Sequence, residues 1–220
     1  MHIRPIAILS VCCLLPHLSG CDDPAPVAPT APPPTVENAP APNSLLDSLE
    51  ITRTIDTSPS TTEPEDPTSA VFLGLETTKP ITWLWQPPKR SMRKANYLVP
   101  GANGTEPAEL TVTHFPEAPG NTPEANIRRW TSQFRSVDGG PAKAKVETFT
   151  VGTMPVTLVE IKGEYMGMGG AWHKADQLML VSMVEAPVGS VFLKLIGPED
   201  TVDANRLAYV EFVKGLKPTQ

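Results

Sequence analysis

The chain has 220 residues, a net charge of -6, 26 prolines and three cysteines. A chain with this acidic balance gives no indication of a nucleic-acid partner. Its composition divides it into a short apolar start, a proline-rich segment and one region of a size usual for a single domain with a real core.

Residues 1–20 have the three parts of a secretory signal peptide. Arg4 supplies the positively charged region, residues 6–15 supply the apolar region, and Ser19 and Gly20 are the small residues that precede a cleavage site. The apolar run is too short to span a hydrocarbon layer of roughly 30 Å. We therefore predict export and cleavage rather than a membrane-spanning helix.

The stretch Leu18, Ser19, Gly20 and Cys21 resembles the lipobox of bacterial lipoproteins. In that family the cysteine sulfur receives a diacylglycerol, and cleavage leaves this cysteine at the N-terminus. The resemblance implies lipidation of Cys21 by palmitate-type chains and a place in the cell envelope, anchored to a lipid bilayer on its periplasmic side. Two or three acyl chains bury enough methylenes for stable anchoring. An ordinary signal peptide with an incidental cysteine is the alternative.

Residues 21–70 form a predicted disordered tether rich in Pro, Ala, Thr, Ser, Asp and Glu. Between residues 22 and 70, nine acidic groups stand against Arg53 alone, so the negative charge of the chain belongs to this segment. One interruption, residues 44–51, is either a short amphipathic docking helix or an incidental apolar stretch. We expect the tether to give the following domain reach from the membrane.

Residues 71–218 are predicted to form one α+β domain, an antiparallel sheet with helices packed on its faces. The first helix is expected over residues 122–134, because Thr122 can cap it, Pro123 suits its first position and Trp130 lies in its apolar stripe. A second helix is expected over residues 199–214. Apolar alternation or continuous apolar runs predict strands at 81–85, 92–99, 108–115, 146–151, 156–161, 178–184 and 191–196.

Short motifs in a fixed order cover most of residues 80–217, at 92–95, 108–112, 125–130 with 133–134, 192–198 and 201–202. This ordered set resembles a family of uncharacterised bacterial lipoproteins. The order of the elements is also similar to the PsbP-like fold, an antiparallel sheet between helices, and PsbP itself is a lumenal accessory protein of a membrane complex. The resemblance implies a fold, and a fold does not fix a function.

The sequence contains no motif for catalysis or for a cofactor. Cys12 and Cys13 leave with the predicted signal peptide, and acylation of Cys21 leaves no thiol for a disulfide or for catalysis. No Gly-x-Ser-x-Gly, His-Glu-x-x-His or phosphate-binding glycine loop is present, and we expect His114 to be a structural histidine. We therefore predict that the protein is not an enzyme and uses no cofactor.

Aromatic, arginine and asparagine side chains suggest a shared binding surface, since aromatic and arginine residues are enriched where proteins bind partners. An envelope protein or an anionic glycan is the partner expected for it. The resulting interpretation is a membrane-anchored, non-enzymatic binding or accessory domain. The residues predicted to line this surface are Trp83, Trp85, Arg93, Asn126 and Arg129.

The stretch 165–173 supports a second interpretation, a periplasmic copper-handling protein. The thioethers of Met166 and Met168 and the imidazole of His173 are soft ligands suited to Cu(I). A flexible glycine hairpin whose methionines cover apolar surface explains the same residues without a metal.

The lipobox resemblance predicts a modification that one substitution removes. Wild-type protein purified from membranes is expected to carry diacylglycerol on Cys21, because the acylating enzyme requires a thiol at that position. Cys21→Ser is expected to be unmodified and to leave the membrane fraction, as judged by intact mass and by fractionation. A wild-type protein with a free thiol at Cys21 contradicts the prediction.

Overall fold

The computed structural model describes residues 55–102, 104–115, 120–167 and 173–219. The predicted signal peptide, Cys21 and most of the predicted tether therefore lie outside the described residues. A compact unit spans Thr52–Gln220. Its elements are β1 (Ser69–Phe72), β2 (Leu75–Thr78), β3 (Leu84–Trp85), β4 (Arg93–Val99), β5 (Ala108–Phe115), α1 (Pro123–Thr131), β6 (Phe134–Arg135), β7 (Ala144–Val151), β8 (Met154–Tyr165), β9 (Lys174–Ala186), β10 (Gly189–Pro198), α2 (Glu199–Ala204), α3 (Arg206–Lys214) and β11 (Lys217–Pro218).

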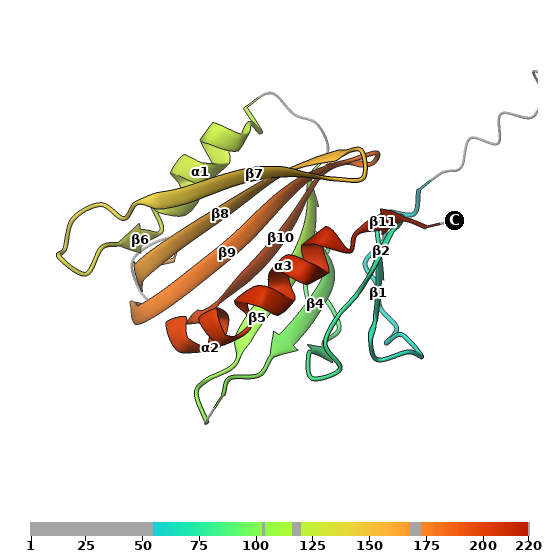
Figure 1. The fold of residues 1–220 in the computed structure, drawn as a ribbon, viewed down its shortest axis with the longest axis horizontal. Helices are drawn as coiled ribbons and strands as arrows, with labels where there is room; N and C mark the ends of the chain where they lie inside the picture. The colour runs from blue at the N-terminus through green and yellow to red at the C-terminus, as the bar shows by residue number, and fades with distance from the viewer. Residues whose placement is uncertain (1–54, 103, 116–119, 168–172, 220) are drawn as a thin grey trace, which may run out of the picture. The chain divides into compact units, whose positions relative to one another are not determined.

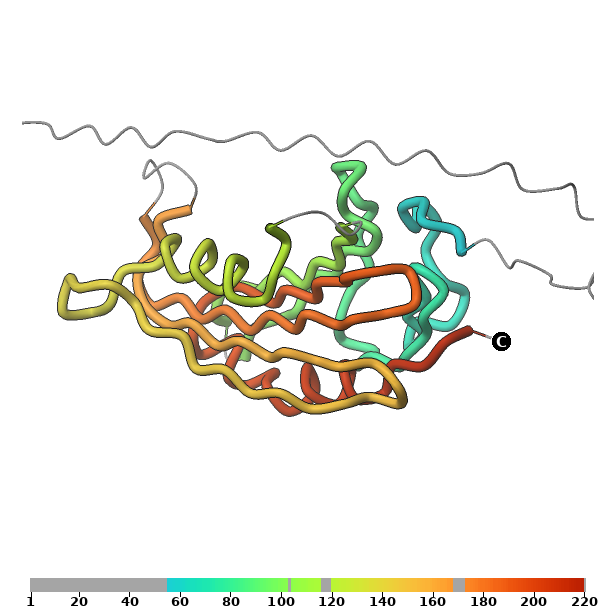
Figure 2. Tube along the Cα trace, turned by 90° about the horizontal axis from the view of Figure 1, so that it is seen from above, coloured from blue at the N-terminus to red at the C-terminus, as the bar shows by residue number. Residues whose placement is uncertain are grey.

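The main sheet has eight strands in the order β3-β4-β5-β10-β9-β8-β6, with β7 also paired to β8. Every pairing in it is antiparallel. Helix α1 lies against one face of this sheet, and α2 and α3 lie against the other (Figures 1 and 2). The predicted α+β class with an antiparallel sheet is confirmed, although the sheet dominates and the helices are short. No helix of the described chain has the length and apolar character needed to cross a membrane.

Tight turns join the long central strands. The β7–β8 hairpin closes where Val151 pairs with Met154, and the β9–β10 hairpin closes where Ala186 pairs with Gly189. Both turns lie between strands predicted from the sequence, but β8 and β9 run further than the predicted 156–161 and 178–184. Two-residue turns leave no slack between strands, so the register of the whole hairpin follows from the turn.

A second, three-stranded sheet in the order β1-β2-β11 was not predicted. Its hairpin turns at Leu73 and Gly74, which have φ values of 55° and 69°. A two-residue turn with positive φ at both positions suits the twist of a hairpin, but leucine rarely adopts such a conformation. The Leu-Gly pair therefore gave no turn signal. Leu73 is buried and packs in the larger of the two hydrophobic cores, which offsets this strain.

Residues before 71, the predicted start of the domain, also make hydrogen bonds with it. The amide of Ser60 donates to the carbonyl of Lys94 at 2.8 Å, and the amide of Lys79 donates to the carbonyl of Thr68 at 2.8 Å. Lys79 is buried, and its ammonium group donates to the carbonyls of Pro67 and Trp83. These contacts attach residues 60–68 to the sheets.

Helix α1 begins as predicted and ends earlier. The hydroxyl of Thr122 accepts from the amide of Ala125 at 3.2 Å, and Pro123 opens the helix. The predicted end at residue 134 is wrong, because the helix stops at Thr131 and Phe134 instead pairs with Tyr165 in the main sheet. The predicted helix over 199–214 is divided into α2 and α3 at Asn205.

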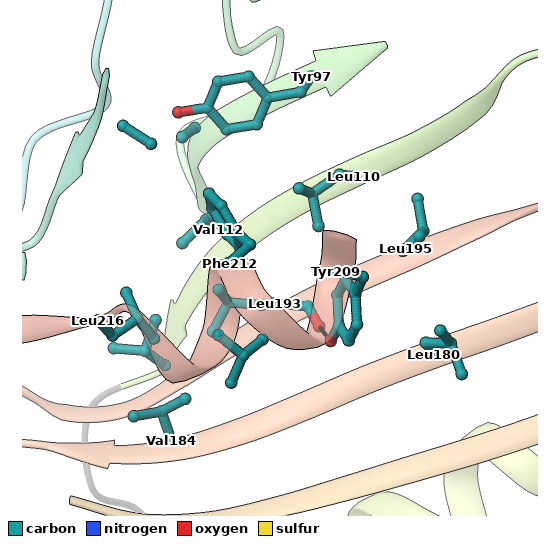
Figure 3. Close-up of a cluster of buried hydrophobic side chains, with 14 of the residues drawn as sticks. Tyr97, Leu110, Val112, Leu180, Val184, Leu193, Leu195, Tyr209, Phe212 and Leu216 are labelled. Carbon is teal, nitrogen blue, oxygen red and sulfur yellow. Dashed lines mark hydrogen bonds between the residues drawn. The ribbon is translucent and has the colours of Figure 1, made fainter. Parts of the chain in front are cut away.

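Two cores occupy the two faces of the main sheet, because successive side chains of a strand point to opposite faces. On β10, Leu193 and Leu195 belong to the core beneath α2 and α3, whereas Phe192 belongs to the core beneath α1. Figure 3 shows the first of these cores, in which Tyr209 and Phe212 of α3 meet leucines and valines from the strands. Register along each strand therefore decides which core a residue joins.

Tyr209 fastens α3 to the centre of the sheet. Its side chain is fully buried, and its hydroxyl lies 2.8 Å from the hydroxyl of Ser182 and 2.7 Å from the carbonyl of Leu193. Burial raises the pKa of this phenol. The hydroxyl therefore remains neutral and available for both hydrogen bonds.

Removing this hydroxyl is expected to destabilise the domain. Tyr209→Phe should lower the free energy of unfolding by about 1–3 kcal/mol, since Ser182 and the Leu193 carbonyl then lose a buried partner. Tyr165→Phe is the matched control, because Tyr165 is half-buried and its hydroxyl has no partner among the described residues. Urea denaturation checks both variants, and equal effects would contradict the role of the Tyr209 hydroxyl.

Candidate functional site

A cleft of about 170 Å³ opens where α1 leaves part of its face of the sheet uncovered. We call it the α1 cleft. It draws side chains from α1 and from four neighbouring strands, so it exists only in the folded sheet. Its lining residues are Arg93, Thr111, Thr113, Phe115, Asn126, Arg129, Trp130, Val181, Phe192 and Lys194.

The floor and one wall of the α1 cleft are aromatic. Trp130 of α1 is buried and packs edge-on against Phe192 of β10, with ring centroids 5.6 Å apart. The ring of Phe115 on β5 is tilted against Phe192, with centroids 5.3 Å apart. The α1 side of the cleft follows from helical spacing. Arg129 and Trp130 lie three and four residues after Asn126, so all three share one side of the helix.

A β-bulge brings Arg93 to the cleft. Arg93 pairs with Thr113, whereas Ala95 pairs with Val112, so the register of β4 shifts between them. Without the bulge, Arg93 and Ala95 would point to the same face. With it, Ala95 is buried in the core beneath α3 and Arg93 lines the α1 cleft.

Arg93 is held by a carboxylate from the next strand. Its Nη1 lies 2.5 Å from Oε1 of Glu109 and its Nη2 lies 3.2 Å from Oε2, a two-pronged arrangement. Nη1 also donates to Oδ1 of Asn96 at 3.1 Å. This pair fixes the guanidinium group, and it balances the charge of one of the three cations at the site.

Lys194 and Arg129 bring further positive charge. Within the described ranges, no carboxylate lies within ion-pair distance of either side chain. Lys194 stands on β10 between Thr111 and Val181, and burial lowers the pKa of its ammonium group. Glu109 acts against this shift and Arg93 adds to it. The site therefore holds cationic groups that the described protein atoms do not neutralise.

Asn126, one of the cleft residues, has a buried acceptor without a described partner. The residue is fully buried, and its Nδ2 donates to Oδ1 of Asn121 and to the carbonyl of Thr122, both at 3.0 Å. Both amide hydrogens are thereby used, which fixes the orientation of the amide. Oδ1 of Asn126 is buried and has no partner among the described residues. An unsatisfied buried acceptor costs about 1–3 kcal/mol.

The predicted binding surface is thus assembled in part. Arg93, Asn126 and Arg129 meet at the α1 cleft, as proposed from the sequence. Trp83 is a correction: it is fully buried in the core on the opposite face of the sheet, and its Nε1 donates to Asn205 at 3.0 Å. Trp85 is half-buried against that same core, so it does not join the cleft either. Trp130 is buried, as predicted.

The sequence analysis missed Lys194, Thr111, Thr113 and Phe192. A signal for Lys194 was present, since it is the only charged residue in the apolar stretch 191–196. A lone charge within a central strand is costly unless something pairs with it. The two threonines lie on β5, and which residues surround them depends on strand pairing.

Residues proposed for copper are only partly described. Met166 is half-buried at the end of β8, where its amide donates to the carbonyl of Gln133 at 2.8 Å. His173 is exposed, and its Nδ1 lies 2.8 Å from Oε1 of Glu164. Met168 lies outside the described residues. Over the described chain, no group of three His, Cys, Asp or Glu residues is placed to hold a metal.

His114 lies on β5, half-buried, with Nε2 2.8 Å from the carbonyl of Val188. This contact ties β5 to the turn between β9 and β10. His114 does not line the α1 cleft.

Comparison with known proteins gives structural likenesses alone. No protein-family model matches the chain, and no curated protein matches it. Solved structures similar to it include a protein of unknown function from Pseudomonas aeruginosa, with a TM-score of 0.44 and 11% identity over 70% of this chain and 97% of the other. Another is cyanobacterial PsbP (CyanoP) from Synechocystis, with a TM-score of 0.45 and 12% identity over 76% of this chain and 96% of the other. The role of the α1 cleft is therefore inferred from the residues that line it.

Lys194 is expected to lower stability in its present position. Since its folded-state pKa lies below the usual 10.5, the unfolded chain holds the proton more tightly. The destabilisation is complete below the folded pKa and declines until it is lost as the pH rises through 10.5. Lys194→Met should therefore increase the free energy of unfolding at pH 7 and lose this advantage near pH 10.5.

Urea denaturation at the two pH values checks this prediction. Lys143→Met is the control, because Lys143 is exposed and makes no ion pair within the described chain. A Lys194→Met variant that is less stable than wild type at pH 7 would show that the ammonium group is well compensated.

Proposed function

We propose that the protein is a membrane-anchored, non-enzymatic binding domain of the bacterial envelope whose ligand site is the α1 cleft. The ligand carries a carboxylate or a similar anionic group. One observation carries the proposal: Arg129 and Lys194 flank an aromatic cleft with no carboxylate of the described chain within ion-pair distance. An anion supplies the missing partner, and a hydrogen bond to a charged group contributes about 1.5–3 kcal/mol.

The chemistry of the cleft supports binding rather than catalysis. Neither a cysteine nor a histidine lines the cleft. Its polar groups are cations, two threonine hydroxyls and one amide. These groups recognise an anion and hold it in place.

The predicted lipid anchor and tether explain how such a domain would be presented. Acylation at Cys21 would hold the chain at a bilayer, and the tether would separate the α1 cleft from the lipid heads. The negative charge of residues 22–70 would extend this segment by self-repulsion. A ligand in the periplasm would then meet the cleft away from the membrane surface.

Arg129 and Arg128 form a matched pair for testing anion binding. Both are exposed on α1, but only Arg129 lines the cleft. Arg129→Gln should weaken the binding of benzoate about tenfold, since a charged hydrogen bond is lost. Arg128→Gln should leave the affinity unchanged. Titration of the full chain followed by calorimetry or NMR measures both values, and equal affinities in the two variants would refute the site.

Copper handling is the second candidate function, and one contact favours it. Glu164 accepts from Nδ1 of His173, which leaves Nε2 as the free ligand atom. A carboxylate commonly orients a metal-binding histidine in this way. The proposed ligand set is Met166, Met168 and His173.

A Cu(I) titration against a competing chelator tests this candidate. The variants are His173→Ala and the double variant Met166→Leu/Met168→Leu, each expected to weaken binding at least tenfold. Met179→Leu is the control, because Met179 is buried in the core beneath α1. Wild type and variants that bind Cu(I) equally would remove copper from consideration.

A further inference from the structure

We infer that the ligand of the α1 cleft is a small aromatic carboxylic acid that also carries a hydrogen-bond donor, such as a hydroxyl or an amine. This inference rests on the proposed function and goes further by naming the chemical class of the ligand. It combines three independent features of the cleft: its cations, its aromatic wall and the buried carbonyl of Asn126.

The hydrogen-bond donor of the ligand is inferred from Asn126. Both hydrogens of its Nδ2 are used within the chain, by Asn121 and Thr122, so the amide cannot turn without losing two hydrogen bonds. Oδ1 is the atom left without a described partner, although the residue is fully buried. Buried polar groups are almost always paired with protein, water or ligand. A carboxylate has no donor, so it cannot satisfy this atom, whereas an O–H or N–H group can.

The acidic group of the ligand is inferred from Lys194 and Arg129. They approach from different elements, β10 and α1, and so can hold one carboxylate from two sides. The Arg93–Glu109 pair beside them keeps Arg93 in place without adding net charge. A neutral ligand would leave the half-buried ammonium group of Lys194 without a compensating charge.

The aromatic body follows from the walls and from the size of the cleft. Trp130 packs edge-on against Phe192, and the ring of Phe115 is tilted against the same Phe192. Rings add to such arrangements through edge and offset contacts. A volume of about 170 Å³ is well below the roughly 300–1,000 Å³ of pockets for drug-sized molecules. The ligand is therefore small, about one ring with its substituents.

The experiment compares three probes on the full chain: benzoate, 3-hydroxybenzoate and 4-hydroxybenzoate. At least one hydroxylated probe is expected to bind wild type fivefold or more tightly than benzoate. NMR should show the Asn126 side-chain amide signals shifting with that probe and not with benzoate. In Asn126→Ala the preference should fall to about one.

Two results would overturn the requirement for a hydrogen-bond donor. If benzoate and both hydroxybenzoates bind wild type equally, the donor requirement is wrong and anion binding remains. If a hydroxylated probe is preferred but Asn126 does not shift, the donor contacts another group and the inference is overturned. The shift on wild type decides this even if Asn126→Ala does not fold.

Two other outcomes concern the proposed function itself. If none of the three acids binds, and Arg129→Gln behaves as wild type does, the α1 cleft is not an anion site. An acetylated and amidated hexapeptide of alternating Asp and Glu represents a protein partner. If this peptide binds more tightly than either hydroxybenzoate, the ligand is an acidic protein segment, and the small-molecule assignment is overturned.

Discussion

The antiparallel register of β5, β10 and β9 is the constraint on which the rest of the structure depends. Along β10, Leu193 and Leu195 point toward α2 and α3, while Phe192 and Lys194 point toward α1. A shift of one residue would exchange the two sets and bury the lysine in the larger core. The tight turn between β9 and β10 fixes this register, and the hydroxyl of Tyr209 anchors α3 to its centre.

The α1 cleft exists because the two faces of the sheet are covered unequally. Helix α1 has nine residues, so it covers only part of its face. At the α1 cleft, β10 contributes a lysine with a lowered pKa, and α1 contributes an asparagine carbonyl without a described partner and an exposed arginine. The lysine and the asparagine carbonyl each lower stability when they stand alone. Residues that lower stability at one shared place are typical of a site selected for binding.

Much of the fold could be predicted because its signals are local. Thr122 and Pro123 mark the start of α1, and the alternation of residues 108–115 marks β5. The first hairpin could not be predicted, since Leu73 adopts a positive φ that its side chain disfavours. The end of α1 was also hidden, because Phe134 pairs with the distant Tyr165. Long-range pairing overrode the local helical pattern at that point.

The sequence by itself determined which segments form the long strands and helices, and it identified Arg93, Asn126 and Arg129 as candidates for one surface. Capping, turn chemistry and alternation act over a few residues, so one chain is enough to reveal them. Only the tertiary structure decided that Trp83 belongs to the opposite core and that Lys194 joins the cleft. Only it revealed the β-bulge that turns Arg93 toward α1. A local turn can set the register of one hairpin, but the neighbours of a side chain also depend on pairing between strands far apart in the chain, such as β5 and β10, which local sequence does not encode.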